Sequence, residues 1–433
     1  MITLGIETSC DETALALIET RAKTDENTRA TAGTEYRILA QTVFSQIDIH
    51  AVYGGVFPVL AKREHAKRLA PLLEHILTES NIATSPLSTT PESLNARKKI
   101  LTDILSEKES DLLDTLVNSP IGNSLLSVRP AIDQIAVTRG PGLEPALWVG
   151  VNFARVLGLI WNIPVIGMNH MEGHIVGSLL PDAKTKSTGS KNADTFSPLH
   201  SIQYPALALL ISGGHTELVE VQSIGSYKIV GATLDDAVGE AYDKVARMMN
   251  IPYPGGPVIA RLAEQARGRK NPIILPRPML HSPDINFSFS GLKTSVLYLI
   301  EKLKKSASGN EIDATTIENI ALAFEDAVTE VLVTKTAKAL DSTGATTLIV
   351  GGGVSANAHI RLALEQLAHE RAIPILMPPA GVSGDNALMI ALAGALSATA
   401  TETAPAPISN KEKAASFDAA SSAPIIAEGN LSL

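Results

Sequence analysis

Two histidines separated by three residues give the sharpest chemical signal in the sequence. They lie in N-H-M-E-G-H at 169–174, where an apolar run that predicts a strand is followed by a predicted helix. On a helix, residues four apart lie about 40° apart around the axis, so the imidazoles of His170 and His174 can reach one metal ion. The spacing alone also allows two capped or solvent-facing histidines.

A metal ion needs at least one more ligand, and a carboxylate is the best candidate. Asp385 lies in S-G-D-N at 383–386, where Gly384 lets the chain approach closely and a helix is predicted to begin. An ordinary helix N-cap explains this aspartate equally well. The sequence therefore indicates a site of two histidines and one carboxylate, with a plain N-cap as the alternative for Asp385.

Glu172 bears on whether such a metal could serve a protease. Zinc proteases of the H-E-x-x-H type place a glutamate beside the first histidine, where it faces the metal-bound water. Here Glu172 is two residues from each histidine, about 200° around the helix from both, and is predicted to point away from the metal. This spacing argues against a metalloendopeptidase.

Three turns rich in glycine or small residues form a second group of signals. They are I-E-T-S at 6–9, S-G-G-H-T at 212–216 and G-G-G-V-S-A-N at 351–357. Each offers backbone N–H groups that can approach a phosphate or a sugar, although Gly-Gly turns are also ordinary hairpin turns. Neither a P-loop motif nor a G-x-G-x-x-G fingerprint occurs, which counts against a P-loop ATPase and a Rossmann dehydrogenase.

Acidic residues close to these turns are candidates for proton transfer or ligand binding. Asp11 and Glu12 follow the first turn and could deprotonate a nucleophile, or could be simple turn residues. Asp236, Glu240 and Asp243 share one face of a helix predicted over 235–250, where a solvated face is the alternative.

Strands and helices alternate along most of the chain, which predicts an α/β fold. Gly-rich strand-to-turn elements occur in both halves and suggest two similar lobes around a cleft. Hairpins are expected over 2–18 and 207–221, and helices over 58–80, 145–161, 291–303, 317–340, 356–369 and 385–397. The first of these helices carries a predicted basic face of Lys62, Arg63, Lys67 and Arg68.

Composition narrows the class of protein further. The chain has 433 residues, enough for two or three domains, and its 36 Lys and Arg against 45 Asp and Glu give a net charge of -9. Binding of nucleic acid by bulk charge is therefore excluded, and any such binding needs a local patch or a partner. One cysteine, Cys10, fits a reducing cytoplasm, and we expect neither a signal peptide nor a membrane span.

The motifs named so far belong to a longer ordered set, which resembles a known family. The motifs are, in chain order, G-I-E-T-S-C-D-E-T, Y-G-G-V-F-P, R-G-P-G-L, N-H-M-E-G-H, L-I-S-G-G-H-T, D-D-A-V-G-E-A-Y-D-K, P-Y-P-G-G-P, F-S-F-S-G-L-K-T, G-G-G-V-S-A-N and G-D-N-A-L-M-I. In this order the set resembles the TsaD-type tRNA threonylcarbamoyladenosine transferases, formerly called glycoproteases or O-sialoglycoprotein endopeptidases, over nearly all of the span from Met1 to about Ser397.

The resemblance implies two actin/Hsp70-like (ASKHA) lobes, each an RNase-H-like α/β unit, around a nucleotide-binding cleft. We expect an N-terminal lobe over 1–180 with an inserted surface excursion at about 83–128, and a C-terminal lobe over 204–398. A mobile loop is expected over 181–203, and a flexible tail over 399–433.

The implied activity is transfer of the threonylcarbamoyl group from threonylcarbamoyl-AMP to the exocyclic amine of adenosine 37, in tRNAs that read codons starting with adenine. The resemblance implies that His170, His174 and Asp385 bind one divalent metal, with Fe(II) favoured and Zn(II) as the alternative. It makes Leu210, Ile211, Ser212, Gly213 and Gly214 the substrate-phosphate segment, Asp243 and Gly256 nucleoside contacts, and Asn357 an adenine-side contact. Asp11 or Glu12 is our hypothesis for the general base.

The same resemblance implies partners and shows one departure. The partners are tRNA, a paralogous ASKHA subunit of the TsaB type and a P-loop ATPase of the TsaE type, with no membrane. Where many members carry aspartate four residues after the second glycine of P-G-G-P, this chain has Ala260, which puts one nucleoside contact in doubt.

Three other functions compete with the transferase. The histidine pair suggests a metalloendopeptidase, which the position of Glu172 opposes. The phosphate-like turns suggest a sugar or acetate kinase of the same superfamily, although such a kinase does not need His170 and His174. A non-catalytic, nucleotide-dependent binding module of the Hsp70 type is the third.

Overall fold

Strands in the N-terminal part of the chain form one mixed sheet. The computed structural model describes residues 1–24, 31–181, 195–306, 312–379, 381–401 and 425–433. The sheet has the order β7-β6-β1-β2-β3-β8, in which β1 pairs antiparallel with β2 and parallel with β6. Its strands are β1 (Ile2–Glu7), β2 (Glu12–Thr24), β3 (Thr31–Ser45), β6 (Gln134–Gly140), β7 (Val165–Asn169) and β8 (Ser197–Pro198).

A second sheet, in the C-terminal part, repeats this pattern. Its order is β11-β10-β9-β12-β13, and β9 pairs antiparallel with β10 and parallel with β12. The strands are β9 (Ala206–Ile211), β10 (Thr216–Ser223), β11 (Ser226–Ala232), β12 (Thr347–Gly351) and β13 (Ile375–Leu376). Both sheets thus follow one plan, three antiparallel strands and two parallel ones around the first strand, and the predicted two-lobed actin/Hsp70-like α/β fold is confirmed.

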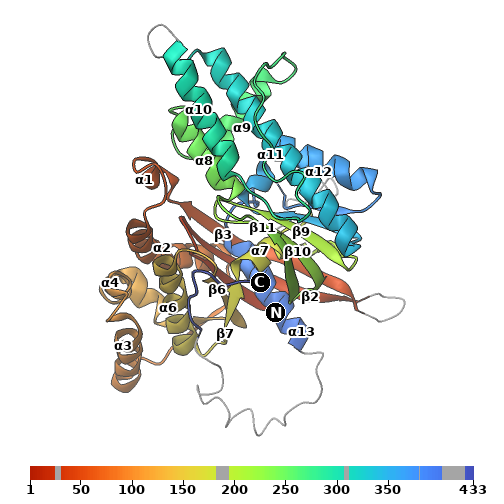
Figure 1. The fold of residues 1–433 in the computed structure, drawn as a ribbon. Coiled ribbons are helices and arrows are strands. Elements are labelled where there is room, and N and C mark those ends of the chain that lie inside the picture. Colours follow the sequence, from red (N-terminus) through yellow and green to blue (C-terminus); the bar gives the residue numbers. More distant parts are fainter. Residues whose placement is uncertain (25–30, 182–194, 307–311, 380, 402–424) are drawn as a thin grey trace.

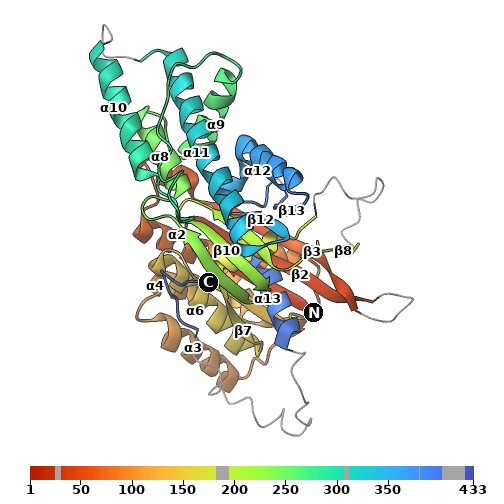
Figure 2. The ribbon, with the colours of Figure 1, turned by 45° about the vertical axis from the view of Figure 1, so that its right-hand side comes forward.

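Helices cover the outer faces of both sheets (Figures 1 and 2). The N-terminal lobe has α1 (Ile47–Ala51), α2 (Pro58–Glu79) and α6 (Glu144–Trp161). The C-terminal lobe has α8 (Val238–Met248), α9 (Gly255–Ala266), α10 (Ser290–Ser306), α11 (Ala314–Thr343), the 3-10 turn Gly353–Ala356 and α12 (Ala358–Glu370). Each lobe buries its own apolar core, around Phe153 and Trp161 in one and around Phe287 and Phe324 in the other. In the described part of the chain no helix is long and apolar enough to cross a membrane.

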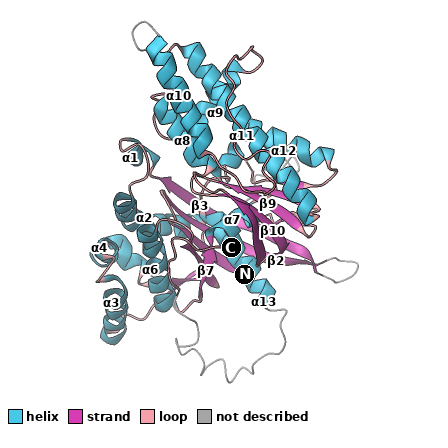
Figure 3. Cartoon of the chain, in the orientation of Figure 1, coloured by secondary structure: helices cyan, strands magenta, loops and turns pink. Residues whose placement is uncertain are grey.

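Two helices lie between the sheets, and each packs against the sheet formed by the other half of the chain. Helix α7 (His170–Gly177) follows the N-terminal strand β7, yet its Met171 and Ile175 pack with C-terminal strands. Helix α13 (Ala387–Thr401) follows β13, yet packs on β1, where a Cβ at Gly5 would lie only 2.8 Å from that of Ala391. The predicted lobe boundaries at 180 and 204 assign each of these helices to the lobe of its own half of the chain. In the structure, each helix packs against the sheet formed by the other half (Figure 3).

The segment expected as a surface excursion at 83–128 is instead a folded helical layer. Leu101, Leu105, Leu112 and Leu116 are buried in the core of the N-terminal lobe, because the amphipathic helices turn these side chains inward. Its elements are β4 (Thr84–Pro86), α3 (Pro91–Leu105), α4 (Ser110–Asn118), α5 (Pro120–Leu125) and β5 (Val128–Pro130).

The expected loop and tail fall partly outside the described residues. Of the loop, 182–194 lies outside them, and the next residues contribute β8, which pairs with β3. Of the tail, 402–424 lies outside them. The prediction of a flexible tail is wrong for 425–433, because Ala427 is buried against the N-terminal lobe and Glu428 binds its backbone.

Candidate functional site

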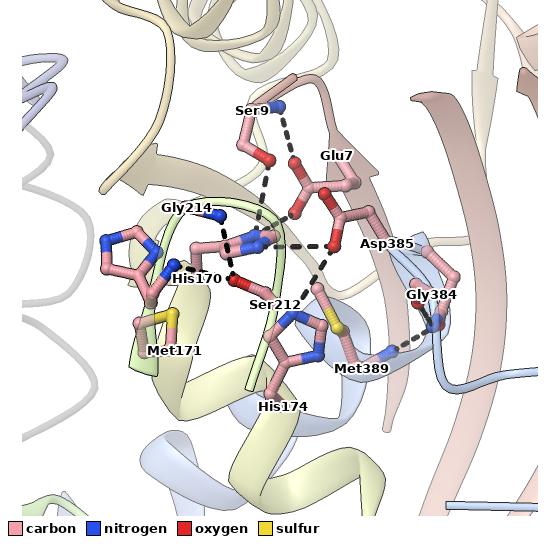
Figure 4. A network of polar contacts seen from close by, with 12 residues as sticks. Glu7, Ser9, His170, Met171, His174, Ser212, Gly214, Gly384, Asp385 and Met389 are labelled. Carbon is pink, nitrogen blue, oxygen red and sulfur yellow. Dashed lines mark hydrogen bonds and ion pairs between the residues drawn. The ribbon is translucent and has the colours of Figure 1, made fainter. Parts of the chain in front are cut away.

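The two histidines are placed by the start of helix α7. Asn169 caps this helix, since its side-chain oxygen accepts hydrogen bonds from the backbone N–H groups of Met171 (2.8 Å) and Glu172 (3.3 Å). The helix therefore starts at the first histidine, and the rings of His170 and His174 lie one turn apart in an edge-to-face arrangement, with centroids 4.7 Å from each other. Both side chains are buried and face the start of α13 (Figure 4).

Asp385 faces this pair because its neighbour does the capping. The side-chain oxygen of Asn386 accepts a hydrogen bond from the N–H of Met389, 3.1 Å away, in the first turn of α13. The Oδ1 atom of Asp385 is then free to lie 3.4 Å from His170 Nε2 and 3.3 Å from His174 Nε2. Asn386, and not Asp385, therefore caps this helix, so the alternative interpretation of Asp385 as a plain N-cap is wrong.

Glu7 holds His170 from the opposite side, a contact that sequence reasoning missed. Glu7 is fully buried at the end of β1, and its Oε2 lies 3.0 Å from His170 Nδ1. Thr138 Oγ1 donates to the same oxygen at 2.6 Å, and the Ser9 N–H donates to Oε1 at 2.5 Å. A carboxylate on the far nitrogen fixes the orientation of a ligand histidine. The available signal was the single acid in I-E-T-S, directly after the apolar run that predicts the first strand.

The three residues fit a metal ion on several grounds. One ligand atom from each of His170, His174 and Asp385 lies within 4.8 Å of the other two. The Nε2 atom of His174 is buried and makes no hydrogen bond within the described residues, as an atom aimed at a metal would be. Two imidazoles and one carboxylate suit Fe(II) or a catalytic Zn(II).

The electrostatics of the cluster favour positive charge at the same place. Burial lowers the pKa of the His170 imidazole, but Asp385 and Glu7 outweigh burial and raise its pKa well above the ordinary value. Burial likewise raises the pKa of the Asp385 carboxyl, but His170 and His174 lower it well below the ordinary value. Carboxylates on both sides of the imidazole thus stabilise a cation between them.

Glu172 has another partner and does not face this cluster. Its Oε1 accepts a hydrogen bond of 2.8 Å from the hydroxyl of Tyr227, on β11. Burial raises the pKa of the Glu172 carboxyl. A protease of that type would need this glutamate beside a metal-bound water, so Glu172 cannot serve as its general base.

Asp11 ends the turn between β1 and β2 and Glu12 begins β2, next to the cluster. Asp11 is buried and its Oδ2 makes no hydrogen bond within the described residues. Burial raises the pKa of Glu12 to about 10, with further contributions from Asp385 and Asp11. Glu12 therefore holds its proton at neutral pH unless a cation offsets the neighbouring carboxylates.

The glycine-rich turn of the C-terminal lobe lies against the other side of the cluster (Figure 4). Leu210 and Ile211 are buried in β9, so only their backbone atoms could meet a ligand. Ser212 Oγ accepts from the N–H groups of Gly214 (3.3 Å) and of His215 (3.0 Å). Gly213 and Gly214 have open space where a side chain would be, which leaves their backbone accessible.

His215 is a second residue that sequence reasoning did not single out. Burial, together with the nearby His170 and His174, lowers the pKa of His215 to about 4. It is therefore a neutral imidazole beside the cluster at neutral pH. Its position directly after the Gly-Gly turn was the only signal in the sequence.

Asp243, one of the predicted nucleoside contacts, lines the C-terminal side of a cavity. Asp243 accepts a hydrogen bond of 2.8 Å from the Gly255 N–H, and burial raises the pKa of its carboxyl while the N–H groups of Gly255 and Gly256 oppose that rise. Asp243 lines a cavity of about 390 Å³, together with Gly54 of the N-terminal lobe and Tyr253 of the other lobe. The cavity is therefore bounded by both lobes.

Asn357 is engaged in the fold of the C-terminal lobe. Its side-chain oxygen caps α12, and its Nδ2 donates to Glu325 at 2.8 Å and lies 3.5 Å from the Tyr242 hydroxyl. Its place next to α8 is consistent with a site near Asp243, but its strongest hydrogen bonds are already made. An adenine-side contact by Asn357 stays a prediction.

Two sequence interpretations of charge are wrong. Helix α8 begins at Val238, so Asp236 precedes it and binds Lys244 (2.7 Å) and Lys293 (2.6 Å) instead of sharing an acidic stripe. The basic face of α2 is paired with acids from two places, because Glu64 lies on α2 itself while Glu109 and Asp111 lie at the start of α4. The ion pairs are Lys62–Glu109, Arg63–Asp111, Lys67–Glu64 and Arg68–Glu64.

Fold and site together define a class. The chain is a two-lobed, actin/Hsp70-like α/β protein whose interlobe helices carry a candidate metal cluster, beside a glycine-rich turn and a cavity shared by both lobes. A sugar or acetate kinase of this class has no need for the two histidines.

Comparison with known proteins identifies the family within this class. The family model of TsaD, tRNA N6-adenosine threonylcarbamoyltransferase, matches residues 37–89 and 103–392. Proteins of that name from Methylobacillus flagellatus and Chromobacterium violaceum are 41% identical over 397 residues and 40% identical over 396 residues. Each alignment covers 92% of this chain, and 92% and 93% of the two relatives. The chain belongs to the TsaD family, and its predicted enzyme class, a transferase that modifies tRNA, is confirmed.

Proposed function

We propose that the chain transfers threonylcarbamoyl from threonylcarbamoyl-AMP to the exocyclic amine of adenosine 37 in tRNA, at the cluster between its lobes. The observation that carries this proposal is the convergence of His170, His174 and Asp385, from two interlobe helices, beside the glycine-rich turn. The turn offers backbone N–H groups for a phosphate, and the cavity beside Asp243 offers room for a nucleoside.

The chemistry requires an activated acyl donor and a well-positioned amine. The lone pair of the adenine amine is delocalised into the ring, which makes it a poor nucleophile. Its nitrogen forms a bond to the carbamoyl carbon while the bond from that carbon to the AMP oxygen breaks, and AMP leaves with the electron pair. Holding the two substrates together supplies much of the rate. Asp11 or Glu12, at the edge of the site, accepts the proton that the amine loses.

A divalent metal held by His170, His174 and Asp385 would act as a Lewis acid toward the threonylcarbamoyl group. Fe(II) is the first choice and Zn(II) the second, because the donor set suits both. Glu7 would orient His170 toward the metal by accepting from its other nitrogen. Because Glu7 is anchored by Thr138 and Ser9, this orientation is built into the end of β1.

The proposal also includes the protein partners that the family resemblance implies. The chain carries a net charge of -9, and the described basic face of α2 is paired with acids, so little free positive charge is available there for tRNA. A paralogous ASKHA subunit of the TsaB type and a P-loop ATPase of the TsaE type would then supply much of the tRNA grip. We place the reaction in the cytoplasm, where tRNA and nucleotides are available.

Metal analysis combined with a transfer assay tests the proposal. We expect purified protein to contain about one Fe or Zn per chain, and to transfer labelled threonylcarbamoyl from the adenylate to tRNA when the partner subunits are present. His170→Ala should lose the metal and reduce transfer by a factor of about 10³ or more, since it removes a ligand. Glu7→Gln should keep the metal but weaken its binding by a factor of about 10 to 100.

A surface histidine provides the matched control. His75 lies on the exposed face of α2, so His75→Ala should keep both metal and transfer. Full transfer by a metal-free protein would refute the metal-dependent mechanism. Cleavage of a glycoprotein by the metal-loaded protein, without transfer, would favour the endopeptidase instead.

A further inference from the structure

The end of the chain returns to the site from a distant part of the sequence. Residues 425–433, which we call the C-terminal strap, run along the N-terminal lobe beside the end of β6 and reach the start of α7 (Figure 1). The family motif R-G-P-G-L at 139–143 forms the surface on which the strap lies. The transfer mechanism above assigns no role to either segment.

Backbone hydrogen bonds join the strap to this motif. The Glu428 N–H donates to the Arg139 carbonyl at 2.7 Å, and the Gly142 N–H donates to the Gly429 carbonyl at 3.0 Å. Gly140 is required for this fit, because a Cβ there would collide with the carbonyl of Glu428. The motif is thus shaped to accept a chain segment.

Apolar packing holds the strap at both ends. Ala427 is 5% exposed, and Ile425 packs with it against the core of the N-terminal lobe. Leu433 packs against the interlobe core cluster that contains Met171 and Ile175 of α7. The strap therefore spans from one lobe's core to the helix that carries the two histidines.

Two contacts connect the strap to His170. Asn169, which precedes this histidine and caps α7, donates from Nδ2 to the Ser432 carbonyl at 3.2 Å. The second connection runs through the 139–143 motif that binds the strap. The Leu143 N–H of this motif donates to the Ser9 carbonyl at 2.7 Å, and Ser9 Oγ lies 3.3 Å from His170 Nδ1. Both segments that flank His170 are thus tied to the end of the chain.

We propose that the C-terminal strap is a positioning element for the candidate metal cluster: it fixes the cap of α7 through Asn169 and the 139–143 turn that supports Ser9. Ligand geometry within about 0.5 Å is what an active metal site needs, and it is set by the groups that hold the ligands. Without the strap, the first turn of α7 loses a bond at its cap and apolar contacts on its side. This inference rests on the proposed function only in that the cluster binds a metal.

Point variants of the full chain test the proposal with a matched control. Ala427→Asp places a charge in the buried contact and should release the strap, whereas Ile426→Asp places the same charge one residue away, where the side chain is 48% exposed. Co(II) or Zn(II) affinity, measured by competition with a chelator, should fall about tenfold for Ala427→Asp and stay unchanged for Ile426→Asp. Amide hydrogen exchange over 170–177 should become faster only in the first variant.

A second pair of variants tests the proposal even if Ala427→Asp fails to fold. Asn169→Ser keeps a capping oxygen but loses the Nδ2 donor, so it should also weaken the metal and speed exchange in α7. A chain ending at Pro424 should behave like Ala427→Asp, and added peptide of sequence IIAEGNLSL should restore its metal affinity. Wild-type metal affinity and wild-type exchange in both Ala427→Asp and Asn169→Ser would overturn the proposal.

Failure of the strap and failure of the metal site give different results. If the wild-type chain binds no metal, the metal-dependent function fails, while hydrogen exchange in α7 still reports whether the strap holds the helix. If the wild-type chain binds metal and exchange in α7 ignores the strap, the strap proposal alone is wrong.

Discussion

The two lobes place a hairpin turn at the equivalent position of their two sheets, yet the turns carry very different side chains. In the N-terminal lobe, 8–11 joins β1 to β2, and Glu7, Asp11 and Glu12 gather in and around it. In the C-terminal lobe, 212–215 joins β9 to β10 and offers two exposed glycines. Carboxylates in and around the first turn favour a cation, whereas the second turn carries no acid and leaves the backbone of two glycines open.

This difference shows how one fold plan can yield an asymmetric site. Each central strand is buried, so the backbone of both turns is fixed by the same pairing. The chemistry then depends on which side chains the turns carry and on the interlobe helices that bring His170, His174 and Asp385 between them. The following substitutions test this difference between the two turns.

The largest effect is expected in the acidic turn. Asp11→Ala or Glu12→Ala should lower the rate of transfer by a factor of about 10² to 10⁴ for whichever residue accepts the proton, while adenylate binding stays nearly unchanged. Single-turnover transfer and adenylate titration measure the two quantities. Asp48→Ala, an exposed acid at the start of α1, is the control. Normal transfer by both variants would place the base elsewhere.

A smaller effect concerns the histidine that braces this turn. His65 of α2 lies 3.0 Å from the Cys10 carbonyl and 2.8 Å from Thr13 Oγ1, and burial lowers its pKa to about 4. In the unfolded chain the imidazole of this histidine takes up a proton near pH 6.5, whereas in the folded state it stays neutral down to about pH 4. The free energy of unfolding therefore falls as the pH falls from 6.5 to 4, by roughly 3 kcal/mol in total. His65→Gln should flatten that part of the profile of unfolding free energy against pH.

Denaturant unfolding at several pH values measures this slope. His75→Gln, on the exposed side of the same helix, should leave it as in the wild type. An identical slope for His65→Gln and the wild type would show that His65 does not stay neutral in the folded state.

The smallest effect is expected in the glycine-rich turn. Gly213→Ala adds a methyl group into open space, so folding and metal content should be unchanged. The methyl group crowds the backbone N–H groups, and the KM for the adenylate should rise by a factor of about 5 to 10, about 1 kcal/mol. Ser223→Ala, at the far end of β10, is the control. An unchanged KM would show that the substrate phosphate does not meet this turn.

Local patterns predicted most of the elements. The helix expected over 58–80 is observed at Pro58–Glu79, and the one over 145–161 at Glu144–Trp161, because their apolar periodicity and prolines are local signals. The helical layer at 83–128 was predicted as a surface excursion, because only the tertiary structure shows that the leucines of its amphipathic helices are buried in the core of the N-terminal lobe.

Charge and capping were less predictable, since both depend on neighbours from elsewhere in the chain. Nothing in the sequence of α2 indicates that Glu109 and Asp111 will pair with its lysine and arginine. Whether Asp385 or Asn386 would cap α13 was likewise open, because either residue is a good N-cap. In the structure Asn386 caps the helix and Asp385 faces the two histidines.

The sequence by itself determined the types of side chain available to the site, the spacing of the histidines and the family of the chain, because these depend only on residues and their order. Tertiary structure decided which side chains meet. Asp385 comes more than two hundred residues after His174 and faces it only because α7 and α13 exchange lobes. Glu7, His215 and the C-terminal strap join the same site through sheet pairing and burial, which act between segments that no local pattern connects.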